Sequence, residues 1–210
     1  MKAAIICNGR IDHYDIAKEQ LSKVDFIICA DGGTRHAYHM NIIPNIIIGD
    51  MDSSKNEYIE YYSSKEVPII KYSSDKNKTD THICLEYAME SYDEIILLGA
   101  TGSRLDHTLG NVSILRLAAD KGKKACIIDE NNEIYVIKEG IRLEGNKGDL
   151  LSLLPLSSEV TGINLKGVYY PLHNAVMEIG NPYGVSNKFE DNVVLLTIAS
   201  GYMIVIKSKD

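Results

Sequence analysis

Six aspartates stand in the loops that follow short aliphatic runs in the first two thirds of the chain. They are Asp31, Asp50, Asp52, Asp75, Asp80 and Asp106. If the fold gathers them in one place, they cannot all stay ionised without a cation to balance their charge. Oxygen ligands without His or Cys favour Mg²⁺, which typically sits between carboxylates and substrate phosphates. We therefore expect Asp50, Asp52 and Asp75 to hold Mg²⁺.

The aliphatic runs predict a fold that brings these loops together. Each run is continuous rather than alternating in polarity, which is typical of strands covered on both faces. The runs are Ala3–Cys7, Phe26–Ala30, Ile46–Ile48, Val67–Ile70, Ile95–Leu98 and Ala125–Ile128. Because helical patterns lie between them, we expect a Rossmann-like α/β domain with a parallel sheet. The carboxyl ends of its strands share one edge and form the binding crevice.

Three of the intervening helices are indicated by sequence. Residues 104–121 carry four apolar side chains on one stripe, Leu105, Leu109, Val112 and Leu115, and Gly122 is a stop signal. Thr79 is suited to cap a second helix that runs to about residue 91. A third helix, rich in tyrosine, is expected over residues 53–65.

Glycines and cations in the same loops are suited to phosphate. Gly32 and Gly99 let the backbone approach a ligand and expose N–H groups near helix N-termini. Arg104 and Lys76 are able to stabilise phosphoryl oxygens, and Asp106 to orient a substrate hydroxyl or accept its proton. Neither GxGxxG nor GxxxxGK[ST] is present, so neither the dinucleotide fingerprint nor the Walker loop is expected.

Each of these residues also has an ordinary structural interpretation. An aspartate at a strand-to-helix junction often caps the helix or forms the turn. His107 is more often a packing histidine than a catalyst, and Asn111, about one turn later, could pair within the helix. Recurrence at four successive strand ends favours the functional interpretation.

The chain changes character after about Lys138. No 3.6-residue period is evident beyond it, and turn signals separate short strand-like runs. These runs are Asp149–Leu154, Val168–Tyr170, Ala175–Ile179, Val193–Ala199 and Met203–Lys207. We therefore expect an α/β domain over residues 1–138 and an all-β sandwich over residues 139–210.

Composition narrows the classes of protein. The 210 residues are 45% hydrophobic and 24% charged, which is typical of soluble globular proteins. With 22 basic and 29 acidic residues the net charge is −7, which argues against a nucleic-acid groove. No segment has the length of a signal-peptide core or of a membrane span. The four cysteines lie far apart without metal spacing, which favours reduced thiols in the cytoplasm.

Taken in order, the motifs resemble those of the thiamine pyrophosphokinase family over essentially the whole chain. They are Ala30–Gly33, Gly49–Ser53, Asp75–Thr81, Gly99–His107 with Asn111, and Gly184–Asn187. The resemblance implies an α/β nucleotide-handling domain followed by a β-sandwich, and a homodimer with active sites at the subunit interface. It also implies Mg²⁺-dependent transfer of pyrophosphate from ATP to the hydroxyl of thiamine, which releases AMP.

The resemblance assigns roles position by position. The aspartates that handle metal and phosphate are Asp31, Asp50, Asp52 and Asp75. The residues on the nucleotide and hydroxyl side are Gly32, Lys76, Thr79, Asp80, Arg104, Asp106, His107 and Asn111. Of these, Asp52, Asp75, Arg104 and Asp106 are expected to be catalytic.

On the thiamine side, the resemblance assigns Ser186 and Asn187 to the part of the sandwich that meets thiamine, and Tyr170 to the aromatic position beside its rings. Thiamine is a cation, so a tyrosine face adds a cation–π attraction, and the chain has no Trp to stack instead. Tyr170 could also be an ordinary strand tyrosine, and Phe189 is an alternative stacking residue. Two positions depart from the family pattern, Lys188 where an acid is common and His82 where Glu is expected.

Two other functions fit the same residues. A metal-dependent phosphohydrolase would use water in place of the alcohol, and the sandwich would serve assembly only. A non-catalytic nucleotide-binding module would use the sandwich for oligomerisation or partner binding. The products formed from ATP with and without thiamine distinguish the three.

Overall fold

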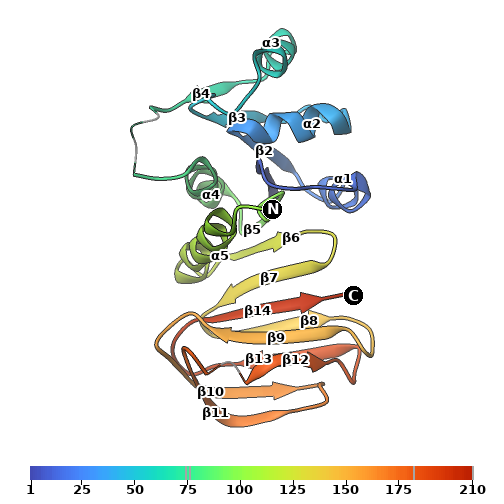
Figure 1. Ribbon diagram of the computed structural model, residues 1–210, viewed down its shortest axis with the longest axis vertical. Helices are drawn as coiled ribbons and strands as arrows, with labels where there is room; N and C mark the ends of the chain where they lie inside the picture. The colour runs from blue at the N-terminus through green and yellow to red at the C-terminus, as the bar shows by residue number, and fades with distance from the viewer. Residues whose placement is uncertain (74, 76, 182, 210) are drawn as a thin grey trace. The chain divides into compact units, whose positions relative to one another are not determined.

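The chain forms two compact units (Figure 1). The structure is a computed structural model that describes residues 1–73, 75, 77–181 and 183–209. The N-terminal unit comprises Met1–Ile114 with Lys123–Glu130, and the C-terminal unit comprises Leu115–Gly122 with Asn131–Asp210. Residues 132–137 are thereby grouped with the C-terminal unit, whereas the predicted boundary after residue 138 leaves them in the first domain.

The N-terminal unit contains the predicted parallel sheet. Its strands are β1 (Lys2–Ile6), β2 (Phe26–Ala30), β3 (Ile46–Gly49), β4 (Ile69–Lys71), β5 (Glu94–Leu98) and β6 (Lys124–Ile128). They are hydrogen-bonded in the order β6-β5-β1-β2-β3-β4, and each neighbouring pair is parallel. The predicted α/β class is therefore confirmed.

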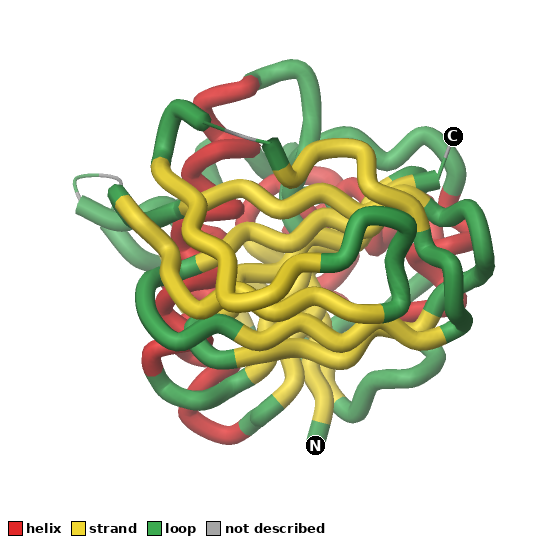
Figure 2. Tube along the Cα trace, turned by 90° about the horizontal axis from the view of Figure 1, so that it is seen from below, coloured by secondary structure: helices red, strands yellow, loops and turns green. Residues whose placement is uncertain are grey.

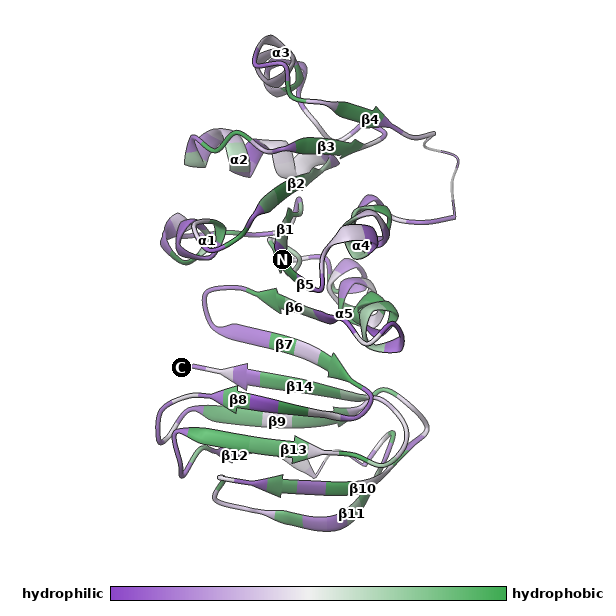
Figure 3. Ribbon diagram, turned by 180° about the vertical axis from the view of Figure 1, so that it is seen from behind, coloured by the Kyte–Doolittle hydropathy of each residue, from purple (hydrophilic) through white to green (hydrophobic). Residues whose placement is uncertain are grey.

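Burial on both faces explains why these strands are continuously apolar. On one face, Ile6, Cys29 and Ile47 share a hydrophobic cluster with residues of α1 (Tyr14–Leu21), α2 (Thr34–Met40) and α3 (Asn56–Ser64). Helix α4 (Asp80–Ser91) contacts β1, β2, β3 and β5 and lies on the other side of the sheet. In Figure 3, β2, β3 and β4 are drawn mainly in green, the hydrophobic end of the scale. Burial of each aliphatic side chain contributes about 1.5–3 kcal/mol, so the sheet holds the loops at its ends firmly.

Helix α5 (Leu105–Asp120) forms where predicted, but its buried face differs. Leu105 and Leu109 are 66% and 58% exposed, whereas Asn111 and Leu115 are buried. At about 100° per residue, the buried face is centred about a quarter turn away from Leu105. Of the four residues predicted to share one apolar stripe, Val112 and Leu115 are buried, and the prediction is wrong for Leu105 and Leu109.

The C-terminal unit is built around two antiparallel sheets. Its strands are β7 (Asn132–Ile137), β8 (Gly140–Glu144), β9 (Leu150–Pro155), β10 (Glu159–Lys166), β11 (Leu172–Glu178), β12 (Gly184–Lys188), β13 (Val193–Thr197) and β14 (Met203–Ser208). One sheet has the order β12-β9-β14-β7 and the other β11-β10-β13-β8. Leu151 and Val205 of the first sheet and Ile163 and Val194 of the second belong to one buried cluster. Yellow strands running back and forth between green loops are evident in Figure 2. The predicted β-sandwich is confirmed.

One predicted strand of this unit is reduced to a single bridge. Val168 pairs with Phe189 as an isolated antiparallel bridge, and Val168–Tyr170 is not a strand. Pro171 follows directly and has no N–H to extend a ladder. In the described part of the chain, no helix has the length and apolar character needed to span a membrane.

Candidate functional site

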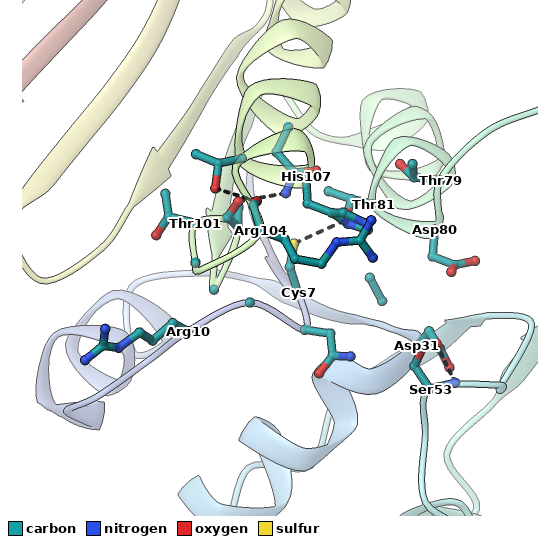
Figure 4. Close-up of a pocket in the computed structure, with 18 of the residues that line it drawn as sticks. Cys7, Arg10, Asp31, Ser53, Thr79, Asp80, Thr81, Thr101, Arg104 and His107 are labelled. Atoms are coloured by element: carbon teal, nitrogen blue, oxygen red, sulfur yellow. Dashed lines mark hydrogen bonds between the residues drawn. The ribbon is translucent and has the colours of Figure 1, made fainter.

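A pocket of about 650 Å³ lies at the carboxyl edge of the sheet, within the N-terminal unit. Segments that follow β1, β2, β3 and β5, and the start of α4, line it together. In Figure 4, Asp31 and Ser53 lie on one side of this space, Thr79 and Asp80 on another, and Arg104 and His107 above it. The predicted site residues that line it are Asp31, Asp50, Asp52, Thr79, Asp80, Arg104, His107 and Asn111.

Three carboxylates form a group that is suited to a cation. One oxygen each from Asp31, Asp50 and Asp52 lies within 4.8 Å of the others. Asp50 and Asp52 were predicted as metal ligands, but Asp31 completes the group. Asp75, which is described, is neither part of this group nor among the residues that line the pocket.

The local backbone explains how Asp31 reaches this position. Asp31 begins a short 3₁₀ turn directly after β2 and has a left-handed φ of 42°. Its Oδ2 accepts a hydrogen bond from the Ser53 N–H (3.1 Å), and its Oδ1 accepts one from the Ser54 hydroxyl (3.1 Å). A Cβ at Gly49 would lie 2.7 Å from the Asp31 Cβ, so only glycine at position 49 leaves room for it. Strained backbone of this kind persists where the surrounding structure enforces it.

The chemistry of this group fits a hard divalent cation. Burial raises the pKa of Asp31 above its ordinary value of 3.8, and the hydrogen bonds from Ser54 and Ser53 oppose that rise. The charge of Asp80 raises it further. Carboxylates that face one another at such distances are stabilised by a cation between them, and an all-oxygen donor set is typical of Mg²⁺. The residues present therefore fit the expected metal.

Cationic side chains line the same pocket. Arg104 was predicted, and its Nη2 lies 2.6 Å from Asp106 Oδ2. The Arg104 guanidinium holds the pKa of Asp106 below its ordinary value, so this carboxylate is a weak proton acceptor. Asp106 itself is not among the lining residues. Lys76, the other predicted cation, lies outside the described residues.

Three further cations of the lining were not predicted: Arg10, Arg35 and Lys78. Lys78 donates to both carboxylate oxygens of Glu86 (2.8 and 2.7 Å), and His82 Nε2 lies 3.5 Å from Glu86. Glu86 lies one helical turn after His82 and contacts both His82 and Lys78. Lys78 could have been predicted to line the pocket from its position directly before Thr79, the predicted helix cap.

The loops that follow β1 and β5 are joined by backbone hydrogen bonds. The Gly9 N–H donates to the Gly99 carbonyl (2.7 Å), and the Arg10 N–H donates to the Thr101 carbonyl (2.8 Å). A Cβ at Gly9 would lie 2.2 Å from the Thr101 oxygen. These hydrogen bonds hold the two loops together, and a side chain at position 9 would not fit where they touch.

Side chains of helix α2 are hydrogen-bonded to the loop that follows β1. The Gly9 carbonyl accepts hydrogen bonds from Arg35 Nη2 (2.9 Å) and His36 Nε2 (2.8 Å). Because a carbonyl only accepts, Nε2 carries a hydrogen, and in the neutral ring Nδ1 then accepts from the Tyr14 hydroxyl (3.0 Å). Burial lowers the pKa of His36 below 6.5 and so favours this neutral form. His36 is a positional support that sequence reasoning missed, because an isolated histidine on a short helix gives no signal.

Thr79 and Asn111 line the pocket and also have structural roles, whereas Gly32 does not line it. Thr79 is the N-cap of α4, and its Oγ1 accepts the N–H of His82 (3.2 Å), as predicted. Asn111 is buried and donates to the Ala100 carbonyl (2.7 Å). Gly32 is buried in the 3₁₀ turn.

The predicted thiamine residues lie in the C-terminal unit. The side chain of Tyr170 is exposed, whereas Asn187 is buried and Phe189 is fully buried. Ser186 is exposed and has a left-handed φ of 58°. Phe189 is therefore excluded as a stacking residue in this conformation, and Tyr170 stays a candidate.

Comparisons with known proteins agree with this architecture. The family model "Thiamin pyrophosphokinase, catalytic domain" matches residues 17–128, and "Thiamin pyrophosphokinase, vitamin B1 binding domain" matches residues 134–203. Thiamine pyrophosphokinase of Bacillus subtilis (strain 168) is 30% identical over 187 residues, 87% of each chain. Thiamine pyrophosphokinase 1 of Oryza sativa subsp. japonica is 26% identical over 235 residues, which covers 99% of this chain and 88% of the relative.

Solved structures give the same result. The crystal structure of thiamine pyrophosphokinase from Bacillus subtilis matches with a TM-score of 0.88 and 25% identity over 100% of both chains. That of thiamin pyrophosphokinase from Geobacillus thermodenitrificans matches with a TM-score of 0.85 and 26% identity, over 100% of this chain and 98% of the other. With both family models matched side by side and relatives aligned over most of their length, this chain belongs to the thiamine pyrophosphokinase family.

Proposed function

We propose that this chain transfers the pyrophosphoryl group of ATP to the hydroxyl of thiamine, giving thiamine diphosphate and AMP. The observation that carries the proposal is the acidic group of Asp31, Asp50 and Asp52 inside the segment matched by the catalytic family model. The second family model, for vitamin B1 binding, supports thiamine as the acceptor. In the reaction the thiamine oxygen bonds to the β-phosphorus, the bond from the β-phosphorus to the oxygen bridging to the α-phosphorus breaks, and the hydroxyl proton is released.

The acidic group would hold Mg²⁺, with Asp75 as a further candidate ligand. The metal would neutralise phosphate charge and fix an in-line geometry. The protein's contribution is to keep the carboxylates at a fixed spacing. Ser53 and Ser54 do this for Asp31, because each donates a hydrogen bond to a different oxygen of its carboxylate.

The cations around the pocket would bind the polyphosphate. Arg104 presents a planar fork that matches phosphoryl oxygens, and Asp106 orients it by a bidentate contact (3.3 and 2.6 Å). We propose that Arg104, with Lys76, His107 and Asn111, contacts the nucleotide and that Asp106 acts through Arg104. Charge stabilisation and alignment are expected to supply most of the rate enhancement, with a smaller contribution from proton transfer.

The two family models support separate roles for the two parts of the chain. We propose that residues 1–138 bind ATP and Mg²⁺ and carry Thr79, Asp80 and the other lining residues. Residues 139–210 would bind thiamine through Tyr170 and Ser186. Since none of the four cysteines forms a disulfide, a reducing, cytoplasmic location is also part of the proposal.

Product analysis tests the proposed function. With ATP, Mg²⁺ and thiamine, AMP and thiamine diphosphate should appear in equal amounts, and neither should form without thiamine. AMP or ADP formed at the same rate without thiamine would support a phosphohydrolase instead. Nucleotide binding without turnover would support a binding module.

We also propose that the active form is a homodimer with its sites at the subunit interface. Leu105 and Leu109 support this, because large apolar side chains that are more than half exposed beside pocket residues are typical of surfaces covered by a partner. Sedimentation should show a dimer at micromolar concentration, and activity per chain should fall on dilution into the monomer range. Full activity in a strictly monomeric sample would contradict the proposal.

A further inference from the structure

The side chain of Asn187 is hydrogen-bonded to backbone groups of its own unit. Asn187 is 8% exposed. Its Oδ1 accepts hydrogen bonds from the N–H groups of Tyr170 (3.0 Å) and Lys188 (2.9 Å), and its Nδ2 donates to the Tyr170 carbonyl (2.8 Å). Buried amides that are satisfied in this way are costly to disrupt, because removal leaves backbone groups without partners.

These bonds continue a strand ladder that the backbone cannot extend alone. Val168 pairs with Phe189, and the Tyr169 N–H donates to the Lys188 carbonyl (2.9 Å). At Tyr170, the Asn187 side chain supplies both the acceptor and the donor that a neighbouring strand would provide. The backbone of Tyr170 is therefore held at the point where the ladder ends.

The backbone held in this way carries an exposed aromatic pair. Tyr170 and Tyr169 are 67% and 59% exposed, and their rings meet edge to face with centroids 4.7 Å apart. Pro171 limits Tyr170 to extended backbone conformations. A ring whose backbone is already ordered loses less entropy when it binds a ligand.

Ser186, the neighbour of Asn187, differs from it in exposure. The pairing of β12 with β9 shifts register between Gly184 and Asn187, and Ser186 there has a left-handed φ of 58°. A bulge of this kind re-aims side chains. Ser186 is exposed and Asn187 is buried. Of the two residues, Ser186 is the one that is accessible to a ligand.

We propose that Asn187 is a positioning residue for thiamine: it acts through Tyr170, by holding that residue's backbone, and does not contact thiamine itself. This inference rests on the proposed function and on Tyr170 as the ring that faces the thiamine cation. It deepens the proposal by separating the role of Asn187 from those of Ser186 and Tyr170.

A double-mutant cycle on the full-length protein tests the inference. Asn187→Ala and Tyr170→Ala should each raise the KM for thiamine, by roughly 2- to 30-fold, the range of a single cation–π contact. In both, kcat and the KM for ATP should stay within about twofold of the unaltered protein. In the Tyr170→Ala background, Asn187→Ala should cause little further change, because the ring that it positions is gone.

Asn164→Ala is the matched control. Asn164 is an asparagine of the same unit whose side chain also serves the backbone: it accepts from the Asn174 N–H (3.0 Å) and donates to the Gly162 carbonyl (3.1 Å). Its replacement should lower the melting temperature as Asn187→Ala does and leave the KM for thiamine unchanged. If Asn187→Ala does not fold, Asn187→Asp, which keeps both acceptor bonds and loses the donor, takes its place in the cycle.

Several results would overturn the inference. An equal rise in the KM for thiamine from the Asn187 substitution with and without Tyr170 would show independent contact with thiamine. An unchanged KM in either single variant would remove the positioning role. Failure of the proposed function is distinguishable, since the unaltered protein would then form no thiamine diphosphate.

Discussion

Turnover is expected to fall by at least about 100-fold when Asp52 is replaced by Asn. Asp52 shares the acidic group with Asp31 and Asp50, and asparagine keeps its size while removing its charge. Its side chain is exposed and accepts a hydrogen bond from Ser53 Oγ (2.9 Å), which an amide oxygen also accepts. The fold should therefore be unaffected. The measurement is AMP formation at saturating ATP and thiamine over a range of Mg²⁺ concentrations, with thermal unfolding in parallel.

Asp93→Asn is the control for this variant. Asp93 belongs to the same unit, its side chain is 77% exposed, and it pairs with Lys123 at 3.4 Å rather than lining the pocket. Its replacement should leave both turnover and unfolding unchanged. Near-normal turnover of Asp52→Asn at saturating Mg²⁺ would contradict a ligand role for Asp52.

Gly9→Ala is expected to impair both stability and catalysis. The added Cβ would lie 2.2 Å from the Thr101 oxygen and 2.3 Å from the Gly99 oxygen, and both are backbone atoms that cannot rotate away. The joined loops must separate, which should lower the free energy of unfolding by about 1–3 kcal/mol. A shift of about 1 Å in residues that align substrate is enough to lower turnover by about 100-fold. Urea unfolding and kcat measure the two effects.

Gly110→Ala makes the same chemical change where space is open. Gly110 lies inside α5, and apart from its chain neighbours and the helix's own backbone no atom lies within 4 Å of a Cβ built there. Because glycine is a poor helix former, this variant should gain about 1 kcal/mol of stability. Equal destabilisation by both substitutions would show that the close approach at Gly9 is not the cause.

The sheet could be predicted because its strands are buried on both faces. Continuous apolar runs such as Phe26–Ala30 stand out from their surroundings without any tertiary information. Helices α1 and α2 could not, since they are only eight and seven residues long and their ordering comes from packing on the sheet. Strand β10 was missed for a related reason: it contains Gly162 and its pairing with β11 has shifts in register.

The sequence predicted that aspartates form the site, but not which of them lie together. Asp50 and Asp52 follow β3 directly, so their position at the sheet edge could be predicted from the sequence. The order of the strands could not be predicted, and the pairing of β2 with β3 brings Asp31 next to Asp50 and Asp52. Asp75 stands four residues past Lys71, the last residue of β4, and the length of that loop is not encoded in any pattern.

The contact between Gly49 and Asp31 has a consequence for how such sequences can diverge. Gly49 is the last residue of β3 and is not among the residues that line the pocket, yet a side chain there would collide with Asp31. A mutation at position 49 would therefore act on the carboxylate of another strand. Selection on the aspartate therefore extends to the glycine, although the glycine itself does not line the pocket.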